Sequence, residues 1–157
     1  MNTNNIKKGC AGCPYLEQKR INGVRMTKET LIVMLCPGKN EKKNGIPLSS
    51  NDNRSATKRI EKCLPQGRTL EDYAVTELVK CYPSNDSVPD SIAVALCYKY
   101  LEEDLCKNSF KKVIVMCKEG IPIVTNIKER NNLDFDIVEG KHPRSGVDDN
   151  TLKSYFL

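Results

Sequence analysis

The sequence lacks tryptophan, contains a single histidine and has only 6% aromatic residues among its 157 positions. No apolar run comes near the roughly 18 to 20 residues that a membrane-spanning helix requires. Residues 1–8 are polar and lack the apolar stretch of a signal peptide. We therefore expect a cytoplasmic protein without membrane contact, and the chain length predicts one domain over residues 1–157 with one core.

Cysteine, by contrast, is plentiful. The eight cysteines are not expected to form disulfides in a reducing compartment, so metal ligation, catalysis or simple burial must explain them. The charge is less distinctive, because 25 lysines and arginines against 20 aspartates and glutamates give a net charge of +5. This balance is compatible with a phosphate-rich partner but does not require one.

Apolar runs alternate with helix-length stretches along the chain. Residues 31–36 form a continuous apolar run that ends at Pro37-Gly38, which is typical of a strand buried on both faces. Further strands are predicted at residues 73–79, 112–117 and 135–138, and helices at 54–64 and 91–107. Asp90 is the expected N-cap of the second helix, whose apolar face we place at Ile92, Leu96, Tyr100 and Leu101. The alternation predicts an α/β fold with a parallel sheet and helices on its faces.

Three predicted loops follow strands, at residues 37–53, 82–89 and 140–146. Loops that leave the carboxyl ends of parallel strands build the ligand site of such folds. The third loop contains His142, the only histidine of the protein. We therefore expect a ligand site where these loops meet.

The cysteines fall into two groups. Cys10 and Cys13 have the C-x2-C spacing that lets two thiolates face one metal centre, while Cys81 follows the second strand and Cys97 lies in the next helix. The spacing alone leaves structural zinc and an iron–sulfur cluster as equal alternatives. The remaining cysteines, in predicted strands and helices, are expected to be small buried residues: Cys36, Cys63, Cys106 and Cys117.

A series of motifs, in order along almost the whole chain, resembles the uracil-DNA glycosylase superfamily and in particular its iron–sulfur branch, often called family 4. The motifs are Cys10-Ala-Gly-Cys13-Pro-Tyr, Pro37-Gly38-Lys-Asn-Glu41-Lys-Lys-Asn-Gly45-Ile-Pro47, Thr76-Glu-Leu-Val-Lys80-Cys81-Tyr-Pro83, Cys97 with Tyr100-Leu101, Val113-Ile-Val115 and His142-Pro143.

The resemblance implies a three-layer α/β/α fold with a four-stranded parallel sheet, and a [4Fe–4S] cluster held by Cys10, Cys13, Cys81 and Cys97. It implies hydrolysis of the N-glycosidic bond of uracil or another altered base flipped out of DNA, a step of base-excision repair. His142 would donate a hydrogen bond to the base oxygen that becomes anionic. The implied base-binding residues are Cys36, Pro37, Gly38, Leu48 and Glu77.

DNA is the expected partner of a monomeric protein. The implied contacts to phosphates come from Ser49, Ser50, Lys141, Arg144 and Ser145. Basic residues around the first and third loops would form a landing surface for the phosphate backbone. The stretch from Arg54 to Arg59 can equally be the solvated face of a helix.

Three positions depart from the family pattern. Leu35 stands where the family commonly has a glutamate linked to activity, and Leu48 stands where an aromatic residue stacks on uracil. Glu77 stands where asparagine reads the base. An ionised glutamate only accepts hydrogen bonds, so it opposes uracil O4 and suits a two-donor edge such as that of guanine. A protonated Glu77 matches uracil, but this requires a strongly raised pKa, so the sequence predicts a pocket that does not prefer plain uracil or prefers it only at low pH.

Other interpretations remain open at this stage. Glu77 can point away from the base and pair with Lys80 or Lys141. The chain can be a catalytically inactive nucleic-acid or nucleotide-binding member of the same superfamily, since Leu35 and Glu77 both depart from the active pattern. A small zinc-stabilised binding domain is the third alternative.

Overall fold

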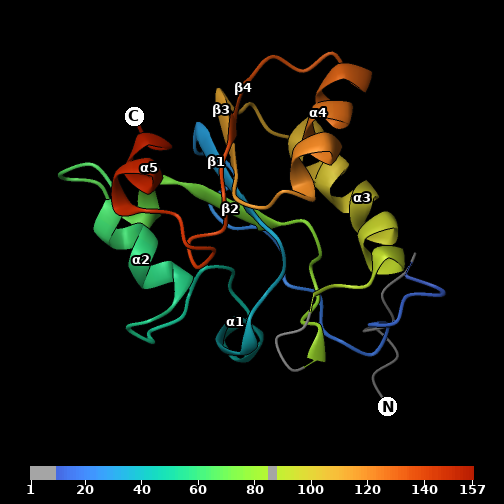
Figure 1. Ribbon diagram of the computed structural model, residues 1–157. Helices are drawn as coiled ribbons and strands as arrows, with labels where there is room; N and C mark the ends of the chain where they lie inside the picture. Colours follow the sequence, from blue (N-terminus) through green and yellow to red (C-terminus); the bar gives the residue numbers. More distant parts are fainter. Residues whose placement is uncertain (1–9, 85–87) are drawn as a thin grey trace.

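Four parallel strands form the centre of the molecule in a computed structural model that describes residues 10–84 and 88–157 (Figure 1). The strands are β1 (Thr30–Met34), β2 (Ala74–Glu77), β3 (Lys112–Val115) and β4 (Asp136–Glu139), and their order in the sheet is β2-β1-β3-β4. All three neighbouring pairs are parallel. The helices are α1 (Lys39–Asn44), α2 (Ala56–Cys63), α3 (Ser91–Cys106), α4 (Gly120–Arg130) and α5 (Asp149–Ser154), with a short 3-10 turn at Leu70–Asp72.

The strand sequences explain why both faces of the sheet are covered. Successive side chains of a strand point to opposite faces. Leu31 and Val33 of β1 therefore join the apolar cluster that contains Leu101 of α3 and Val124 of α4. Ile32 and Met34 point the other way, into the cluster formed with α2 and α5. The result is the predicted three-layer α/β/α architecture, with α3 and α4 on one side of the sheet and α2 and α5 on the other (Figure 1).

All four predicted strands are present; β1, β2 and β3 are shorter than their predicted runs, and β4 has the predicted length but begins one residue later. The predicted cap is also present, because the Asp90 side chain accepts a hydrogen bond from the backbone N–H of Ile92. The predicted apolar face of α3 is correct at Leu101, which is buried, but is displaced by one position at the other predicted residues. Its buried residues recur every fourth position, whereas Ile92 is 55% exposed. A shift by one residue turns a helix face by about 100°. The buried face consists of Ala93, Cys97, Leu101 and Leu105.

Two further expectations are corrected. The predicted loop at residues 37–53 contains helix α1, which ends at Gly45 in the left-handed conformation with φ of 71°. The four cysteines expected in the core also divide. Cys63 and Cys117 are buried, but Cys36 is half-buried and Cys106 is exposed. Cys106 follows the buried Leu105 and therefore faces away from the sheet at the end of α3.

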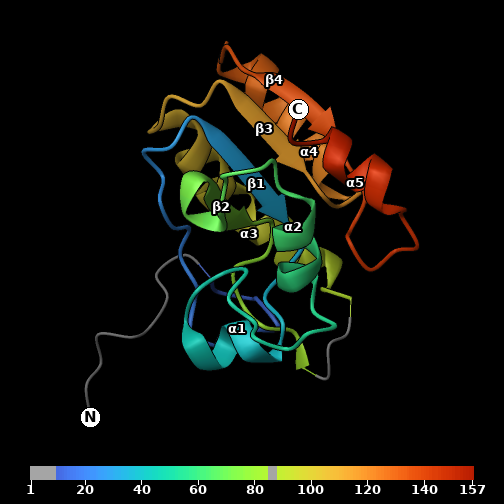
Figure 2. The same ribbon diagram turned by 90° about the vertical axis from the view of Figure 1, so that its left-hand side faces the viewer.

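The sheet directs its strand ends toward one end of the molecule. The arrow of β1 points to the region where α1 lies, and the segments that follow β1 and β2 are found there (Figure 2). In the part of the chain that the structure describes, no helix is long and apolar enough to cross a membrane.

Candidate functional site

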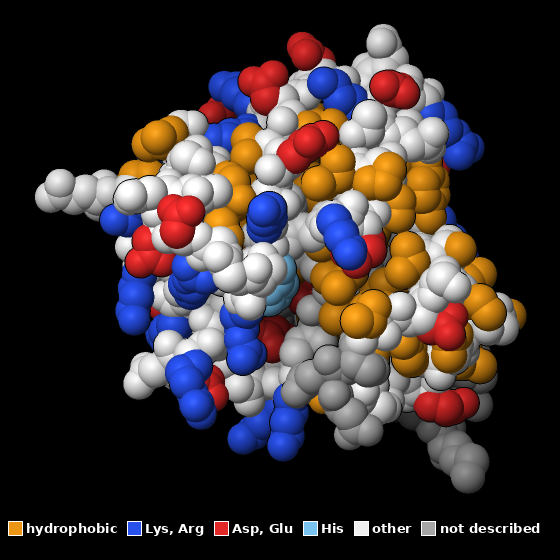
Figure 3. Space-filling model, viewed as in Figure 1, with side chains coloured by type: hydrophobic (Ala, Val, Ile, Leu, Met, Phe, Trp, Pro, Cys, Tyr) orange, Lys and Arg blue, Asp and Glu red, His pale blue; other side chains and the backbone are white. Residues whose placement is uncertain are grey.

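A cavity of about 920 Å³ opens beyond the carboxyl ends of β1 and β2. In Figure 3 the histidine side chain lies in a hollow with lysine and arginine side chains around it. The structure brings together eight of the residues predicted for base and DNA binding or catalysis. They line the cavity from four separate segments: Cys36, Pro37, Gly38, Leu48, Ser50, Glu77, His142 and Arg144.

Glu77 lies at the carboxyl end of β2 and is only 3% exposed. Its Oε2 atom is shielded from solvent and has no hydrogen-bond partner among the described residues. The pKa of this carboxyl group is raised to about 8, mainly by burial and also by the nearby Glu41 carboxylate, while Lys80 opposes both. Glu77 is therefore a neutral acid at neutral pH, able to donate one hydrogen bond and accept another.

The alternative partners expected for Glu77 are engaged elsewhere or absent. Lys80 Nζ donates to Asp104 Oδ2 at 2.6 Å and to Thr76 Oγ1 at 2.6 Å, which ties the end of β2 to α3. No ion pair between Glu77 and Lys141 is found among the described residues. Glu77 faces the cavity instead.

Glu41 is a second carboxyl group at the cavity, on the first turn of α1. The glycine at position 38 permits its orientation. A Cβ at Gly38 would lie 2.7 Å from Glu41 Oε2, so the carboxylate folds back over the glycine backbone into space that a side chain would otherwise occupy. Sequence reasoning recognised Glu41 as part of a motif but assigned it no role.

Leu48 and Leu35 both line the cavity. Leu48 is 7% exposed and adopts a left-handed backbone conformation with φ of 48°, which is costly for a residue other than glycine. Backbone strain of this kind concentrates at functional sites. Leu35 presents an apolar side chain where the resemblance implies a carboxylate, and Asp52 is the carboxyl group that the 45–55 segment contributes to the cavity.

His142 is held in one tautomer by its own loop. The backbone N–H of Arg144 donates to His142 Nδ1 at 3.1 Å, so the proton of the neutral imidazole lies on Nε2. Burial lowers the pKa of His142, and the positive charge of Arg144 lowers it further. The side chain thus offers the cavity a neutral N–H donor at neutral pH.

The loop that carries His142 is anchored at both ends. Before His142, the Gly140 N–H donates to the Val115 carbonyl at 2.8 Å and the Lys141 N–H donates to the Tyr155 hydroxyl at 3.1 Å. After His142, the Arg59 guanidinium donates to the carbonyls of Pro143 and Val147 and pairs with Asp149 at 3.0 Å. Arg59 thus joins α2 to this loop, a role that its position in a run of basic residues did not indicate.

The predicted serine contacts differ from one another. Ser50 is buried at the cavity, where its hydroxyl accepts from Asn40 Nδ2 at 2.8 Å. The Ser49 hydroxyl donates to the Ile46 carbonyl and the Ser145 hydroxyl donates to the His142 carbonyl at 2.7 Å, so both stabilise turns in their own loops. Ser49, Lys141 and Ser145 are not among the described residues that line the cavity.

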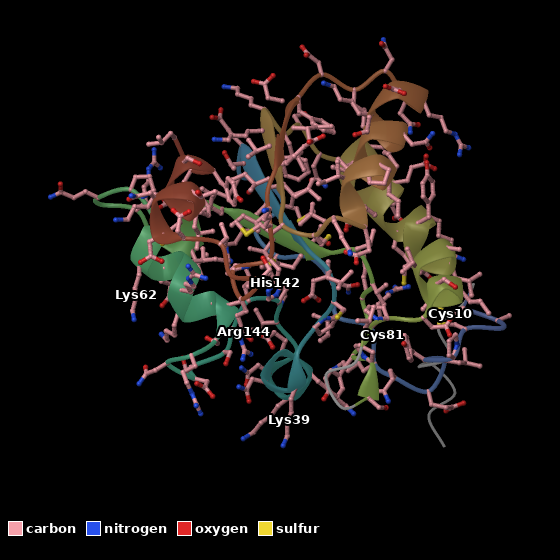
Figure 4. The ribbon with its side chains drawn as sticks, viewed as in Figure 1. Cys10, Lys39, Lys62, Cys81, His142 and Arg144 are labelled. Carbon is pink, nitrogen blue, oxygen red and sulfur yellow. The ribbon has the colours of Figure 1, made fainter. Side chains whose placement is uncertain are left out.

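Two of the predicted ligand cysteines, Cys10 and Cys81, lie in a second region, away from the histidine (Figure 4). Cys10, Cys81 and Cys97 are each at most 4% exposed, and Cys13 is half-buried. Burial raises the pKa of the Cys97 thiol, a backbone hydrogen bond from Lys80 lowers it, and charge on Cys81, Cys10 and Cys13 raises it further. The effect of Cys81, Cys10 and Cys13 on Cys97 indicates that these three thiols lie near it.

The surroundings of these thiols tie remote segments together. The Cys13 N–H donates to the Cys10 carbonyl at 2.9 Å, and the Tyr100 hydroxyl of α3 lies 3.7 Å from Cys10 Sγ. The Ile21 N–H donates to the Lys80 carbonyl at 2.7 Å. Four thiols are a donor set that suits a soft metal centre. Within residues 10–84 and 88–157, however, no three histidine, cysteine or acidic side chains are arranged to hold a metal ion.

Comparisons with known proteins agree with this picture in part. No family model matches the chain. A type-4 uracil-DNA glycosylase of Sulfurisphaera tokodaii is 30% identical over 113 residues, which cover 72% of this chain and 50% of the relative. The chain thus spans about half the length of that curated relative.

Among solved structures, the crystal structure of AF0587, a protein of unknown function, matches with a TM-score of 0.50 at 14% identity. The match covers 82% of this chain and 44% of that one. At this identity the likeness concerns the fold alone.

Proposed function

We propose that this chain is a single-domain member of the uracil-DNA glycosylase superfamily, of its iron–sulfur type 4 branch, and that it hydrolyses the N-glycosidic bond of uracil or a related altered base in DNA. The observation that carries the proposal is the cavity in which a neutral His142 N–H donor and the buried, unpartnered Glu77 carboxyl group converge. The similarity to a type-4 uracil-DNA glycosylase supports the same assignment.

Glu77 would read the edge of a flipped-out base. A neutral carboxyl group donates one hydrogen bond and accepts another, which matches the O4 acceptor and the N3–H donor of uracil. The requirement for low pH expected from the sequence is thereby relaxed, because burial and Glu41 keep Glu77 neutral up to about pH 8. A base filling the cavity would also satisfy the orphaned Oε2 atom, whose burial without a partner is otherwise unfavourable.

His142 would stabilise the departing base. When the bond between C1′ of the sugar and the base nitrogen breaks, its electron pair moves onto the base, and negative charge develops on the base oxygens. A neutral His142 Nε2–H directed at that oxygen lowers the barrier without having to transfer a proton. Water then adds its oxygen to C1′, and the proton that it loses neutralises the base anion through solvent, leaving an abasic site and the free base.

The remaining cavity residues would position the nucleotide. Pro37, Gly38 and Cys36 provide a backbone segment that a base can approach closely, and Leu48 packs on its face without the stacking of an aromatic ring. Around the opening, Lys39, Arg54 and Arg144 supply positive charge for the phosphate backbone. We retain Ser49, Ser50, Lys141 and Ser145 as proposed phosphate contacts.

The four thiols would hold a [4Fe–4S] cluster through Cys10, Cys13, Cys81 and Cys97. The donor set fits, because all four ligands are cysteines and they come from three segments that already contact one another. A cluster spaces its thiolates more widely than a zinc ion, whose bonds to sulfur measure about 2.3 Å. The cluster would supply cross-linking of the N-terminal segment, the end of β2 and α3 rather than catalysis.

A glycosylase assay tests the proposal. Holoprotein is incubated with single- and double-stranded oligonucleotides that contain uracil, hypoxanthine or xanthine, and alkali-labile abasic sites are resolved on a gel. We expect cleavage at uracil and a rate about 10²–10³-fold lower for His142→Ala, the loss typical of removing one oxyanion donor. Cleavage that is unchanged in His142→Ala would refute the assigned role.

A second candidate function rests on Leu35, which replaces the family's carboxylate in the cavity wall. A binding protein that kept the pocket but lost the chemistry would retain uracil-containing DNA in a gel-shift experiment and release no base. The same oligonucleotides therefore separate the two functions.

A further inference from the structure

Two carboxyl groups face the same cavity from different elements. Glu77 lies on β2 with its Oε2 buried and unpartnered, and Glu41 lies on α1 with its Oε2 folded over Gly38. Two neighbouring carboxylates in a site with little solvent do not both ionise readily, because like charges disfavour each other. The less exposed of the two, Glu77, is the one that keeps the proton.

The other charged groups around Glu77 do not remove this constraint. Lys80, which would favour its ionisation, is already engaged by Asp104 and Thr76 in the layer between β2 and α3. Among the described residues, the remaining titratable side chains that face the cavity belong to the end of β1, α1, the 45–55 segment and the His142 loop: Cys36, Lys39, Asp52, Arg54, His142 and Arg144. Lys39, Arg54 and Arg144 are solvent-exposed, so water screens their effect on a group at the cavity floor.

We propose that Glu41 is a positioning residue that keeps the proton on Glu77 and so determines which bases the pocket accepts. The accepted class consists of bases whose buried edge places a hydrogen-bond acceptor beside an N–H donor, as uracil and hypoxanthine do. This inference rests on the proposed function, since it assumes that a base occupies the cavity.

The carboxyl pair makes the choice of base depend on pH. Once Glu77 ionises, both of its oxygens only accept hydrogen bonds, and O4 of uracil then faces a lone pair. The ionised form instead suits an edge with two adjacent donors, such as N1–H and the 2-amino group of guanine. Uracil recognition is therefore present below the pKa of Glu77 and lost above it.

The experiment compares wild type with Glu41→Gln and Glu77→Gln as holoproteins. Glu129→Gln, which removes an exposed carboxylate from α4, is the matched control. The rate of uracil excision is measured from about pH 6 to about pH 10. Wild type and Glu129→Gln should lose activity around pH 8, and Glu77→Gln, which stays neutral, should show no such loss.

Glu41→Gln should move this loss to lower pH, because removing the nearby negative charge eases the ionisation of Glu77. A shift of about one pH unit corresponds to a tenfold lower rate at pH values above the midpoint. A pH profile of Glu41→Gln that coincides with that of wild type would overturn the inference while leaving the glycosylase function intact.

A second measurement does not depend on activity. Infrared spectra of the wild-type holoprotein at neutral pH should contain the carbonyl stretch of a neutral carboxylic acid, and this band should be absent from Glu77→Gln. As the pH is raised, the band should be lost at a lower pH in Glu41→Gln than in wild type. If no base is released but this band behaves as expected, the effect of Glu41 on Glu77 is supported and the proposed function is refuted. If base is released and the band is absent from wild type, the inference about Glu41 and Glu77 is refuted and the proposed glycosylase function is supported.

Discussion

At the residue scale, the Glu77 side chain shows what the sequence can and cannot determine. The sequence identifies position 77 as the departure that matters and states both outcomes, an acceptor-only carboxylate or a donor and acceptor pair. Which one holds depends on burial and on Glu41, and these follow from the tertiary packing that places α1 and the end of β2 at one cavity. No local pattern encodes that packing, so the protonation state could not be predicted.

Glu77 should also make the stability of the protein depend on pH. Its pKa is raised from about 4.5 in the unfolded chain to about 8 in the folded protein. The folded state retains the proton while the unfolded state loses it, so stability is full below about pH 4.5, falls as the pH rises, and levels off above about 8. Glu77→Gln removes this loss.

Relative to wild type, Glu77→Gln should therefore become more stable as the pH rises, by an amount of the order of 3 kcal/mol between about pH 4.5 and pH 7. Thermal unfolding of both proteins across this range checks the prediction, with Glu129→Gln as the control. A difference in midpoint temperature that stays constant with pH would show that Glu77 is ionised in the folded state.

His142 should produce a loss of activity at acid pH. A protonated Nδ1 can no longer accept the hydrogen bond from the Arg144 N–H, because two donors would then face each other. The orientation of the ring would therefore be disturbed. Because burial and Arg144 lower the pKa of His142 below 6.5, kcat/KM for uracil excision should remain level around pH 6.5 and fall only at more acid values. If kcat/KM already begins to decline above pH 7 as the pH is lowered, His142 is not neutral at neutral pH.

At the scale of elements, sequence patterns predict the sheet well and the surroundings of the site less well. The strands are predicted because continuous apolar runs such as residues 31–36 require burial on both faces. Helix α1 is missed because its six residues, Lys39–Asn44, contain no buried side chain and carry no apolar periodicity. The role of Arg59 is missed because a basic residue beside a loop looks the same whether it contacts phosphate or a carbonyl.

Substitutions of Arg59 distinguish an anchor of the His142 loop from a contact to DNA phosphate. Arg59 anchors the His142 loop, so Arg59→Ala should lower kcat about tenfold or more with little change in KM. The reason is that a small displacement of a catalytic group slows the chemical step. Arg59→Lys should restore only part of this loss, because one ammonium group cannot bond both carbonyls in a fork. The measurement is steady-state kinetics on a uracil-containing oligonucleotide at two salt concentrations.

A phosphate contact by Arg59 would give a different pattern. Affinity for DNA would fall, and the dependence of binding on salt would become less steep by about one charge in the variant. Lys58→Ala is the control, since Lys58 lies beside Arg59 on α2 but pairs with Glu61 at 3.1 Å.

At the scale of the whole molecule, the four thiols come from parts of the chain that are distant in sequence. The N-terminal segment, the end of β2 and α3 are linked by a few hydrogen bonds and by the small apolar cluster of Val79, Ala93 and Cys97. The C-x2-C spacing and the order of the motifs predict which cysteines would be ligands. How near these cysteines lie to one another depends on the tertiary packing of the N-terminal segment, the end of β2 and α3, which spacing does not reveal.

The cysteines provide their own matched control. Cys81→Ser should lower the iron content of the purified protein and reduce its thermal stability by several degrees, because the link between remote segments is weakened. Cys106→Ser, an exposed thiol at the end of α3, should retain about four irons per chain and wild-type stability. Equal iron content in both variants would exclude Cys81 as a ligand.

The most direct test of the whole account is the release of free base by the iron-loaded protein. An oligonucleotide with one uracil is incubated near pH 7 and again above pH 9, and free uracil and abasic sites are quantified by mass spectrometry. The account predicts equal amounts of both products near pH 7, at least tenfold less above pH 9, and little of either with His142→Ala. Failure of the iron-loaded protein to release uracil or hypoxanthine at either pH would contradict it.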